Sequence, residues 1–208
     1  MKIIIFGATG SVGRHIVDLA LDEGHEITAF ARTPHALRIE HENLTLVAGD
    51  AFDPVSVSEA VKGHDCVMVT LGSPKLTGKI RSVGTKNILG AMEQHGVKRL
   101  ICQTTLGIGD SYNNLNFFWK YLMFGMILRR VYDDHVVQEA LVKRSSISWT
   151  IVRPSSFADG PATGSYKSGF GPQEKGLSLK ITRMDIAEFM LRQIDNNKYL
   201  RHCVGISN

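Results

Sequence analysis

The sequence predicts one α/β domain built on a doubly wound parallel sheet. Short apolar runs alternate with amphipathic stretches from the first residue to about residue 154, as in repeated strand–helix–strand units. A glycine-rich loop directly follows the first apolar run. The 208 residues are 43% hydrophobic and 21% charged, and no linker or low-complexity tract divides them. A single domain over residues 1–208 is therefore expected.

Six short runs have the apolar, β-branched composition of buried strands. The predicted strands are Lys2–Phe6, Ile27–Ala31, Leu44–Ala48, Cys66–Thr70, Arg99–Gln103 and Trp149–Val152. Between and after them, apolar residues recur three and four positions apart, which predicts helices. This spacing is clearest in Val12, Ile16, Leu19 and Ala20, in Val136, Val137, Ala140 and Leu141, and in Ala187, Met190, Leu191 and Ile194.

The helix boundaries are marked by capping and terminating residues. Asp53 followed by Pro54 is typical of a helix start, because aspartate caps free N–H groups and proline suits the first turn. Gly24, Gly63 and Gly96 fall where helices are expected to end. Residues 156–181 are rich in Gly, Ser, Pro and Lys and are interpreted as a surface loop that contacts substrate.

The charge and cysteine content narrow the class of partner. The chain has 24 Lys and Arg against 20 Asp and Glu, a net charge of +4, and its basic residues are scattered. This favours a small anionic ligand, and no nucleic-acid partner is expected. Of Cys66, Cys102 and Cys203, two lie in apolar runs, which indicates a reducing cytoplasm. No secretory signal precedes the first strand.

The most apolar later stretch, Phe117–Leu128, is interrupted by Lys120 and is too short to cross a bilayer, which needs roughly 20 apolar residues. We expect no membrane partner and interpret the stretch as a buried or lid helix. Its aromatic and methionine residues favour core packing or a dimer face over a cover for a planar substrate, and a monomer or weak homodimer is expected. These residues are Phe117, Phe118, Trp119, Tyr121, Met123, Phe124 and Met126.

The loop Gly7-Ala8-Thr9-Gly10-Ser11-Val12-Gly13 joins the first strand to the first helix. Glycines there allow a tight turn and let backbone N–H groups approach a pyrophosphate at the helix N-terminus. Because strand, loop and helix coincide, the pattern predicts dinucleotide binding. The alternative is a turn without a ligand.

The second strand ends at Ala31-Arg32, and no acidic residue occurs between Ile27 and Ile39. An NAD site usually places a carboxylate there for the ribose diol. A guanidinium can instead pair with the 2′-phosphate of NADP, and Arg14 could help it. We therefore expect NADPH to be preferred over NADH, the alternative being that both arginines are solvated surface charge.

Several motifs resemble the atypical branch of the short-chain dehydrogenase/reductase superfamily, over essentially the whole chain. The GxxGxxG spacing, Gly49-Asp50 and Val69-Thr70-Leu71-Gly72 carry this likeness. The later motifs look like the biliverdin-IXβ reductase and flavin reductase family, and the resemblance implies a Rossmann fold. They are Asp133-Asp134-His135, Ile151-Val152-Arg153-Pro154, Gly160-Pro161-Ala162-Thr163-Gly164-Ser165-Tyr166 and Arg183-Met184-Asp185-Ile186-Ala187.

The resemblance also implies roles for individual residues. Asp50 would meet the adenine, the Leu71-Gly72 turn would lie along the cofactor, and Thr105 would take the place of the superfamily serine beside the nicotinamide. His135 would face the cofactor, with a helix-cap role as the alternative, and Ser156 stands where the family commonly has a histidine. The predicted cofactor-binding residues are Gly7, Thr9, Gly10, Ser11, Val12, Arg32, Asp50, Ala51, Leu71, Gly72, Thr104, His135 and Pro154, and the predicted catalytic residues are Thr105 and Ser156.

No tyrosine is followed four residues later by lysine, so the Tyr-x-x-x-Lys pair that protonates carbonyl substrates is absent. Hydride transfer to a flavin needs mainly proximity and orientation, which Thr105 could provide while solvent supplies the proton. Thr105 could instead only satisfy backbone at the strand end.

The sequence thus predicts an NAD(P)H-dependent reductase of a flavin or similar planar acceptor. The alternatives are a non-catalytic redox sensor resembling the NmrA-like regulators and, less favoured, a nucleotide-sugar epimerase relative. The histidines and cysteines have no metal-ligand spacing, and no metal is predicted.

Overall fold

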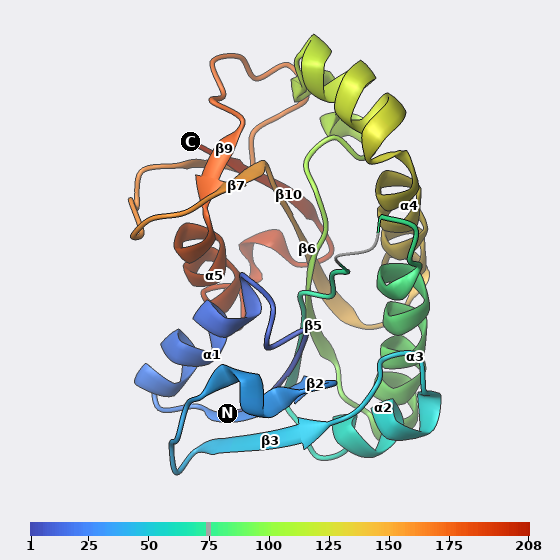
Figure 1. Ribbon diagram of the computed structural model, residues 1–208, viewed down its shortest axis with the longest axis vertical. Coiled ribbons are helices and arrows are strands. Elements are labelled where there is room, and N and C mark those ends of the chain that lie inside the picture. Colours follow the sequence, from blue (N-terminus) through green and yellow to red (C-terminus); the bar gives the residue numbers. More distant parts are fainter. Residues whose placement is uncertain (74–75) are drawn as a thin grey trace.

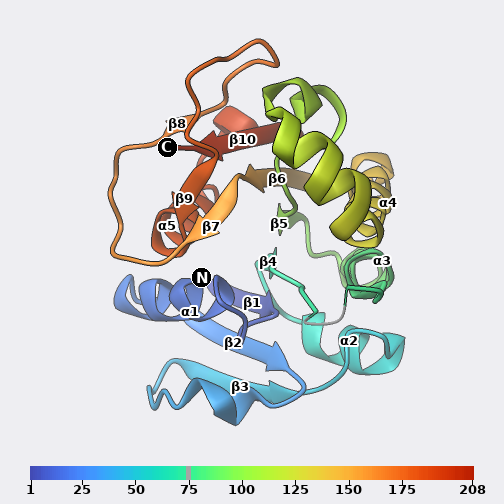
Figure 2. The ribbon, with the colours of Figure 1, turned by 45° about the horizontal axis from the view of Figure 1, so that its top comes forward.

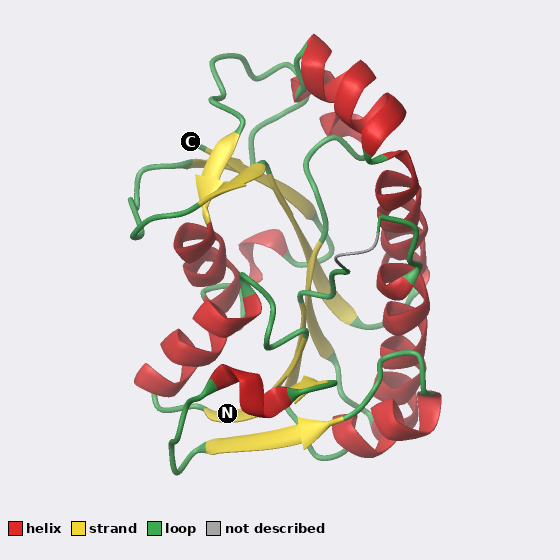
Figure 3. Cartoon of the chain, in the orientation of Figure 1, coloured by secondary structure: helices red, strands yellow, loops and turns green. Residues whose placement is uncertain are grey.

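A computed structural model describes residues 1–73 and 76–208 and places an eight-stranded sheet between two layers of helices (Figures 1 and 3). Its strand order is β3-β2-β1-β4-β5-β6-β10-β8, parallel throughout except that β8 runs antiparallel to β10. The predicted doubly wound fold is confirmed. In that order the strands are Leu44–Ala48, Glu26–Ala31, Lys2–Phe6, Cys66–Val69, Arg99–Gln103, Ser148–Pro154, Cys203–Ser207 and Lys167–Ser168.

The helices cover both faces of the sheet (Figure 2). On one face α1 (Gly13–Asp22) packs against α5 (Arg183–Leu191), and on the other α3 (Ile80–His95) packs between α2 (Pro54–Val61) and α4 (Arg129–Arg144). Alternate side chains of β1 enter the two cores, because successive residues of a strand point to opposite faces. Ile3 and Ile5 join the α1 side, and Ile4 and Phe6 join the other. Shorter helices span Pro34–Leu37, Gly109–Asn114 and Asn197–Tyr199.

The predicted helix boundaries agree with the caps that the structure shows. Asp53 accepts a hydrogen bond from Val55 N–H at 3.0 Å, and Pro54 opens α2. Gly96 caps α3 with a φ of 72°, a left-handed conformation that glycine adopts without strain.

The six predicted strands are present; β1, β3 and β5 have the predicted ends, and the other three differ by one or two residues at an end. β4 ends at Val69 instead of Thr70, and β6 runs from Ser148 to Pro154 instead of from Trp149 to Val152. Four strands were not predicted: β7 (Ser156–Ala158), β8, β9 (Lys180–Thr182) and β10. The first three have only two or three residues, which is too short for any periodic pattern.

The segment 156–181 is more ordered than the predicted surface loop. It begins in β7, which pairs in parallel with β9 at its far end, and its middle supplies β8. Asp185 of α5 ties it down: the carboxylate accepts from the backbone N–H of Thr163 and of Gly164, both at 2.9 Å, and from the hydroxyls of Thr163 and Thr182 at 2.8 Å. Although burial opposes ionisation, these donors, led by Gly164 N–H, lower the pKa of Asp185.

The apolar stretch after residue 116 forms a π-helix, η3 (Phe118–Ile127), at one end of the molecule (Figure 1). Leu128 N–H bonds to Met123 O, five residues earlier, as a π-helix requires. Only Phe124 of this helix is buried, whereas Phe117 just before it is 77% exposed and Met126 is 73% exposed. The prediction of a buried, core-packing helix is therefore wrong, because η3 meets the rest of the protein along one side only. The dimer-face and lid interpretations stay predictions.

Candidate functional site

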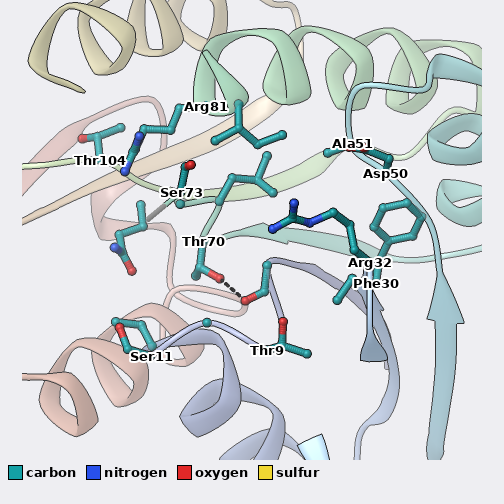
Figure 4. Close-up of a pocket in the computed structure, with 18 of the residues that line it drawn as sticks. Thr9, Ser11, Phe30, Arg32, Asp50, Ala51, Thr70, Ser73, Arg81 and Thr104 are labelled. Atoms are coloured by element: carbon teal, nitrogen blue, oxygen red, sulfur yellow. Dashed lines mark hydrogen bonds between the residues drawn. The ribbon is translucent and has the colours of Figure 1, made fainter. Parts of the chain in front are cut away.

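A cavity of about 590 Å³ follows the carboxyl ends of β1, β2, β3, β4 and β5. Strands β1 and β4 are neighbours at the point where the strand order reverses, which is where open α/β sheets bind ligands. Figure 4 shows Thr9 and Ser11 below the cavity, Arg32 with Asp50 and Ala51 to one side, and Thr104 beside Arg81 at the other end. Of the predicted cofactor-binding residues, those that line it are Gly7, Thr9, Gly10, Ser11, Val12, Arg32, Asp50, Ala51, Leu71, Gly72, Thr104 and His135.

The glycine loop is tightly folded against β4. Gly7 has a φ of 86°, and a Cβ there would lie 2.6 Å from Thr70 O, so only glycine fits. Gly10 N–H donates to Gly7 O at 2.8 Å. The Thr70 hydroxyl reaches Phe6 O at 3.2 Å and Gly7 O at 3.3 Å. No side chain among the described residues caps the start of α1, so an anion can bind at this helix N-terminus.

Polar groups with different chemistry lie along the β2 and β3 side of the cavity. Arg32 is exposed at the end of β2, and its side chain extends over the cavity (Figure 4). Asp50 follows β3, and its carboxylate accepts from Phe52 N–H at 3.0 Å. This side therefore offers a cation for an anionic group and a carboxylate for a donor.

Two threonines follow β5 and face different surroundings. Thr104 is buried, and its hydroxyl donates to Glu139 Oε1 at 2.9 Å, so this hydroxyl points into the protein. Thr105 is half-buried and donates to Leu106 O at 3.3 Å, a long bond that a ligand can replace. Thr105 is therefore the hydroxyl that can serve a ligand at the end of β5.

His135 lies on α4 and is neutral at physiological pH. Burial, with the positive charge of Arg81 acting in the same direction, lowers the pKa of His135 to about 4. Its Nδ1 lies 2.9 Å from Gln138 Oε1, while Gln138 Nε2 donates to the Thr85 hydroxyl at 3.0 Å and to Cys102 Sγ at 3.3 Å. Since the Gln138 carbonyl accepts, Nδ1 of His135 carries the proton and Nε2 is a hydrogen-bond acceptor.

A second cavity, of about 200 Å³, adjoins the first. Its wall is apolar and includes Leu106 and Leu115 with Trp119 and Phe124 from η3. Ser156 lines it, as does Ser155, whose buried hydroxyl has no hydrogen-bond partner among the described residues.

Three residues line both cavities, and these are Thr105, His135 and Phe157. The large cavity suits an elongated anionic ligand, and the small one a flat apolar group. Their shared residues lie where two such ligands would meet.

A protein-family model described as NAD(P)H-binding matches residues 7–197. The chain belongs to this family. The sequence is 26% identical over 209 residues to the uncharacterized sugar epimerase YhfK of Bacillus subtilis, which covers 94% of this chain and 88% of that protein.

Two solved structures share the fold over the full chain. ChuY, an anaerobillin reductase from Escherichia coli O157:H7, is 23% identical with a TM-score of 0.80, and the alignment covers 97% of it. A short-chain dehydrogenase/reductase from Veillonella parvula in complex with NADP is 17% identical with a TM-score of 0.82, with 94% covered. The Rossmann fold and the NAD(P)H-binding assignment predicted from the sequence are thus confirmed, among oxidoreductase-like and epimerase-like relatives.

The geometry fits an NAD(P)H dinucleotide. The glycine loop leaves no room for a side chain at Gly7, the start of α1 is uncapped, and the cavity extends from there to Thr105. Within residues 1–73 and 76–208 no helix is long and apolar enough to cross a membrane. The same residues contain no cluster of His, Cys, Asp and Glu that could hold a metal ion.

Pro154 and Ser156, unlike the other predicted site residues of this NAD(P)H-binding protein, do not line the large cavity. Pro154 is buried in β6, where it pairs with Ile206 of β10 and its carbonyl accepts from Leu106 N–H at 2.8 Å. It therefore lies within the sheet and does not line the large cavity. Ser156 lines the small cavity only.

Sequence reasoning missed a buried charge network behind Thr104. Arg153 of β6 binds Glu139 of α4 through two bonds of 2.8 and 2.7 Å, and both side chains are 2% exposed. Lys143 adds a third contact to Glu139 at 2.9 Å, and Asp110 binds Arg153 at 2.7 Å. An arginine inside an apolar strand, as in Ile151-Val152-Arg153, was the available signal, because such a charge must be paired when buried. Arg81, which lines the large cavity, was also missed.

Proposed function

We propose that this protein is a reductase that uses NADPH in preference to NADH to reduce a flat conjugated acceptor such as a flavin. One observation carries the proposal: the cavity suited to the dinucleotide and the apolar cavity meet at Thr105, His135 and Phe157. When bound, the cofactor supplies a hydride. The protein then has to hold the acceptor in contact with the nicotinamide.

The large cavity divides the work of cofactor binding among its residues. The glycine loop and the start of α1 would hold the pyrophosphate, and Arg32 the 2′-phosphate. Asp50 and Ala51 would border the adenine, while Leu71 and Gly72 would lie along the ribose and phosphates.

The small cavity would take the acceptor. Trp119, Phe124 and Phe157 give it aromatic walls, against which a flat ring can pack. The buried Ser155 hydroxyl and the Ser156 side chain could bind polar atoms at the edge of such a ring.

Proton delivery would be left to solvent. His135 is neutral and its Nε2 carries no proton, so it is suited to receive a hydrogen bond and not to give a proton. Thr105 would orient the nicotinamide and the acceptor through its hydroxyl. The three cysteines of the chain are free, which agrees with activity in the reducing cytoplasm.

The test is an assay of the purified protein with NADPH or NADH and, in turn, riboflavin, FMN, biliverdin and a quinone, followed at the nicotinamide absorbance band. We expect oxidation of NADPH with at least one flat acceptor and a lower kcat/KM with NADH. Turnover of NADPH with none of them would overturn the proposal. Heat-denatured protein is the control for direct reduction of the acceptor.

A non-catalytic redox sensor is the second candidate, and one observation favours it. The aromatic and aliphatic side chains of η3 form an exposed apolar surface next to the small cavity, where a partner protein could detect the bound nucleotide. Tight NADPH binding without turnover of any acceptor would favour this reading.

A further inference from the structure

Arg81 is a buried cation that the fold leaves incompletely paired. It lies in the first turn of α3, its residue is 9% exposed, and it lines the large cavity. Its Nε and Nη1 atoms are shielded from solvent and have no hydrogen-bond partner among the described residues. Burying unpartnered N–H groups of a charged side chain is costly, so an arginine in this state calls for an explanation.

The neighbouring carboxylate supplies only part of one, because Asp134 pairs with the charge of Arg81 without a hydrogen bond to it. Asp134 lies 3.8 Å from Arg81 Nη1, beyond hydrogen-bond distance. That carboxylate is already satisfied, since it accepts from the backbone N–H groups of Arg81 and Ser82 at 3.1 and 3.0 Å and from the Ser82 hydroxyl. Asp134 therefore caps α3 and would remain bonded without the guanidinium.

The position of Arg81 identifies the end of the cavity that it serves. Figure 4 places its side chain beside Thr104, away from Arg32 and the adenine side. Arg81 Nη1 lies 3.8 Å from the carboxylate of Asp134, the residue before His135, which lines both cavities. Arg81 thus places a fixed positive charge near the junction of the two cavities.

We propose that Arg81 binds the negative charge that develops on the acceptor during reduction; this inference rests on the proposed function. The acceptor gains a hydride, one proton with two electrons, from the C4–H bond of the dihydronicotinamide. It forms one new bond to hydrogen and becomes an anion, while the nicotinamide ring is oxidised. A proton from water then neutralises the reduced acceptor, which balances the reaction.

This role narrows the class of acceptor and its orientation. In a flat heterocycle with an imide edge, such as an isoalloxazine, the added charge concentrates on the carbonyl and nitrogen atoms of that edge. The planar guanidinium matches two adjacent acceptor atoms, so the imide edge would extend past the junction into the large cavity to meet Arg81, while the rest of the ring packs against the aromatic wall of the small cavity. A preorganised cation in a shielded site stabilises such a charge more than water does.

The kinetic test compares Arg81→Met and Arg81→Lys with Lys79→Met, which removes an exposed charge two residues away. With NADPH and riboflavin, we expect Arg81→Met to lower kcat roughly 100-fold, Arg81→Lys to stay within about 10-fold of the wild type, and Lys79→Met to stay within about twofold. The Kd for NADPH, measured by calorimetry, should change less than about threefold in all three variants. In Arg81→Met, kcat should fall by the same factor with riboflavin and with FMN, because the charge arises on the ring and not on the phosphate.

Two readouts do not depend on turnover. A buried cation kept for a ligand should not stabilise the free protein, so the Tm of Arg81→Met without ligands should be no lower than that of the wild type within about 2 °C. In the complex with NADP⁺ and riboflavin, Arg81 should lower the pKa of the flavin imide, visible in the absorbance spectrum, and Arg81→Met should abolish that shift.

The outcomes separate the inference from the function on which it rests. Wild-type turnover with an unchanged kcat in Arg81→Met, or a loss confined to FMN, overturns the inference alone. So does a tenfold loss of NADPH affinity at unchanged kcat, which would make Arg81 a cofactor ligand. A clear drop in Tm would assign Arg81 a structural role. Absence of wild-type turnover with every acceptor overturns the proposed function and the inference with it.

Discussion

The two ends of the large cavity are built in different ways. At the β1 end the site for an anion is built from backbone, namely the turn at Gly7 and the uncapped start of α1. At the β5 end the surface is side chain: Thr104 is held by Glu139, Glu139 by Arg153, and His135 by Gln138. Those side chains come from β5, α4 and β6, which are far apart in the chain.

This contrast indicates what each end can tolerate. A binding surface made of backbone loses affinity when a side chain is added to it. A side-chain network loses stability or activity when one of its members is removed. The first depends on few positions and preserves general nucleotide binding, while the second can be rebuilt for different acceptors. Substitutions at the two ends should therefore fail in different assays, one in binding and the other in stability or turnover.

The largest effect is expected at the β5 end. Glu139→Gln leaves the buried Arg153 guanidinium without its buried counter-charge, with only the exposed Asp110 still paired to it, and should lower the free energy of unfolding by about 3–5 kcal/mol, measured by urea denaturation. The matched control is Glu188→Gln, which breaks the partly exposed 3.1 Å pair between Glu188 of α5 and Arg192 and should cost less than about 0.5 kcal/mol. Similar losses of unfolding free energy in the two variants would show that the buried pair contributes no more to stability than the pair on α5.

The same pair predicts acid sensitivity. Burial opposes ionisation of Glu139, but the hydrogen bonds and charge of Arg153, with Lys143, hold its pKa below the usual 4.5. Because the folded pKa is below the unfolded one, this contribution to stability is present above about pH 4.5 and is lost as the pH falls through the folded pKa. Thermal melts from about pH 6 to pH 3 should show a steeper fall for the wild type than for Glu139→Gln.

At the β1 end the prediction concerns binding. Gly10→Val should weaken NADPH binding at least about 100-fold, or roughly 2.7 kcal/mol, because the new side chain occupies the space of the pyrophosphate. The fold should survive, since a Cβ at Gly10 lies 3.0 Å from Gly7 O, a tight contact that a small shift relieves. Calorimetry and circular dichroism measure the two effects. Gly90→Val is the control, because a Cβ there meets open space. Normal NADPH binding by Gly10→Val would show that the loop is a turn without a role in binding.

Arg32 tests whether the β1 end also selects between cofactors. Arg32→Ala should remove most of a preference for NADPH over NADH, about 1.5–3 kcal/mol for a charge-assisted contact, in titrations of both cofactors. Arg144→Ala, an exposed arginine at the end of α4, should leave the preference intact. Equal affinities for the two cofactors in the wild type would show that Arg32 is only surface charge.

The smallest effect is expected at Thr105. Thr105→Val should keep NADPH affinity and lower flavin turnover about tenfold, roughly 1.4 kcal/mol, if the hydroxyl only orients the reactants. Thr105→Ser, which keeps the hydroxyl, should stay close to the wild type. Steady-state rates measured across pH distinguish orientation from acid catalysis. If Thr105 were a general acid, Thr105→Val should lose about 100-fold or more in rate and should lack a pH dependence that the wild type shows. An unchanged rate would assign Thr105 to the strand end.

The sequence predicted the β1 end better than the β5 end, for a physical reason. Gly10 and Asp53 act on backbone within a few residues, so their effect can be read locally. The pairing of Arg153 with Glu139 depends on how α4 packs beside β6, which no local pattern contains. Arg81 could not be recognised either, because its unpartnered N–H groups are a property of the folded surroundings.

Burial of η3 was misjudged for a related reason. Its composition is that of a core helix, and composition indicates preference for an apolar neighbour without showing whether one is present. In the fold, Phe124 faces the small cavity and residues such as Phe117 and Met126 face outward. Strands β7, β8 and β9 were missed for a different reason, because two or three residues are too few to show a periodic pattern.

Strand β10 has a consequence for the order in which the chain assembles during synthesis. It lies between β6 and β8 in the sheet but follows both along the chain. At about 5–20 residues per second, a ribosome needs roughly 2–7 s to pass from Ser168 to Cys203, and meanwhile β6 has an open edge and β8 has no partner. Strands β1 to β4 need nothing from this late strand. The strands that carry the nucleotide-binding loops can therefore pair before β10 is made, whereas α1 gains its partner α5 only when residues 183–191 have been synthesised.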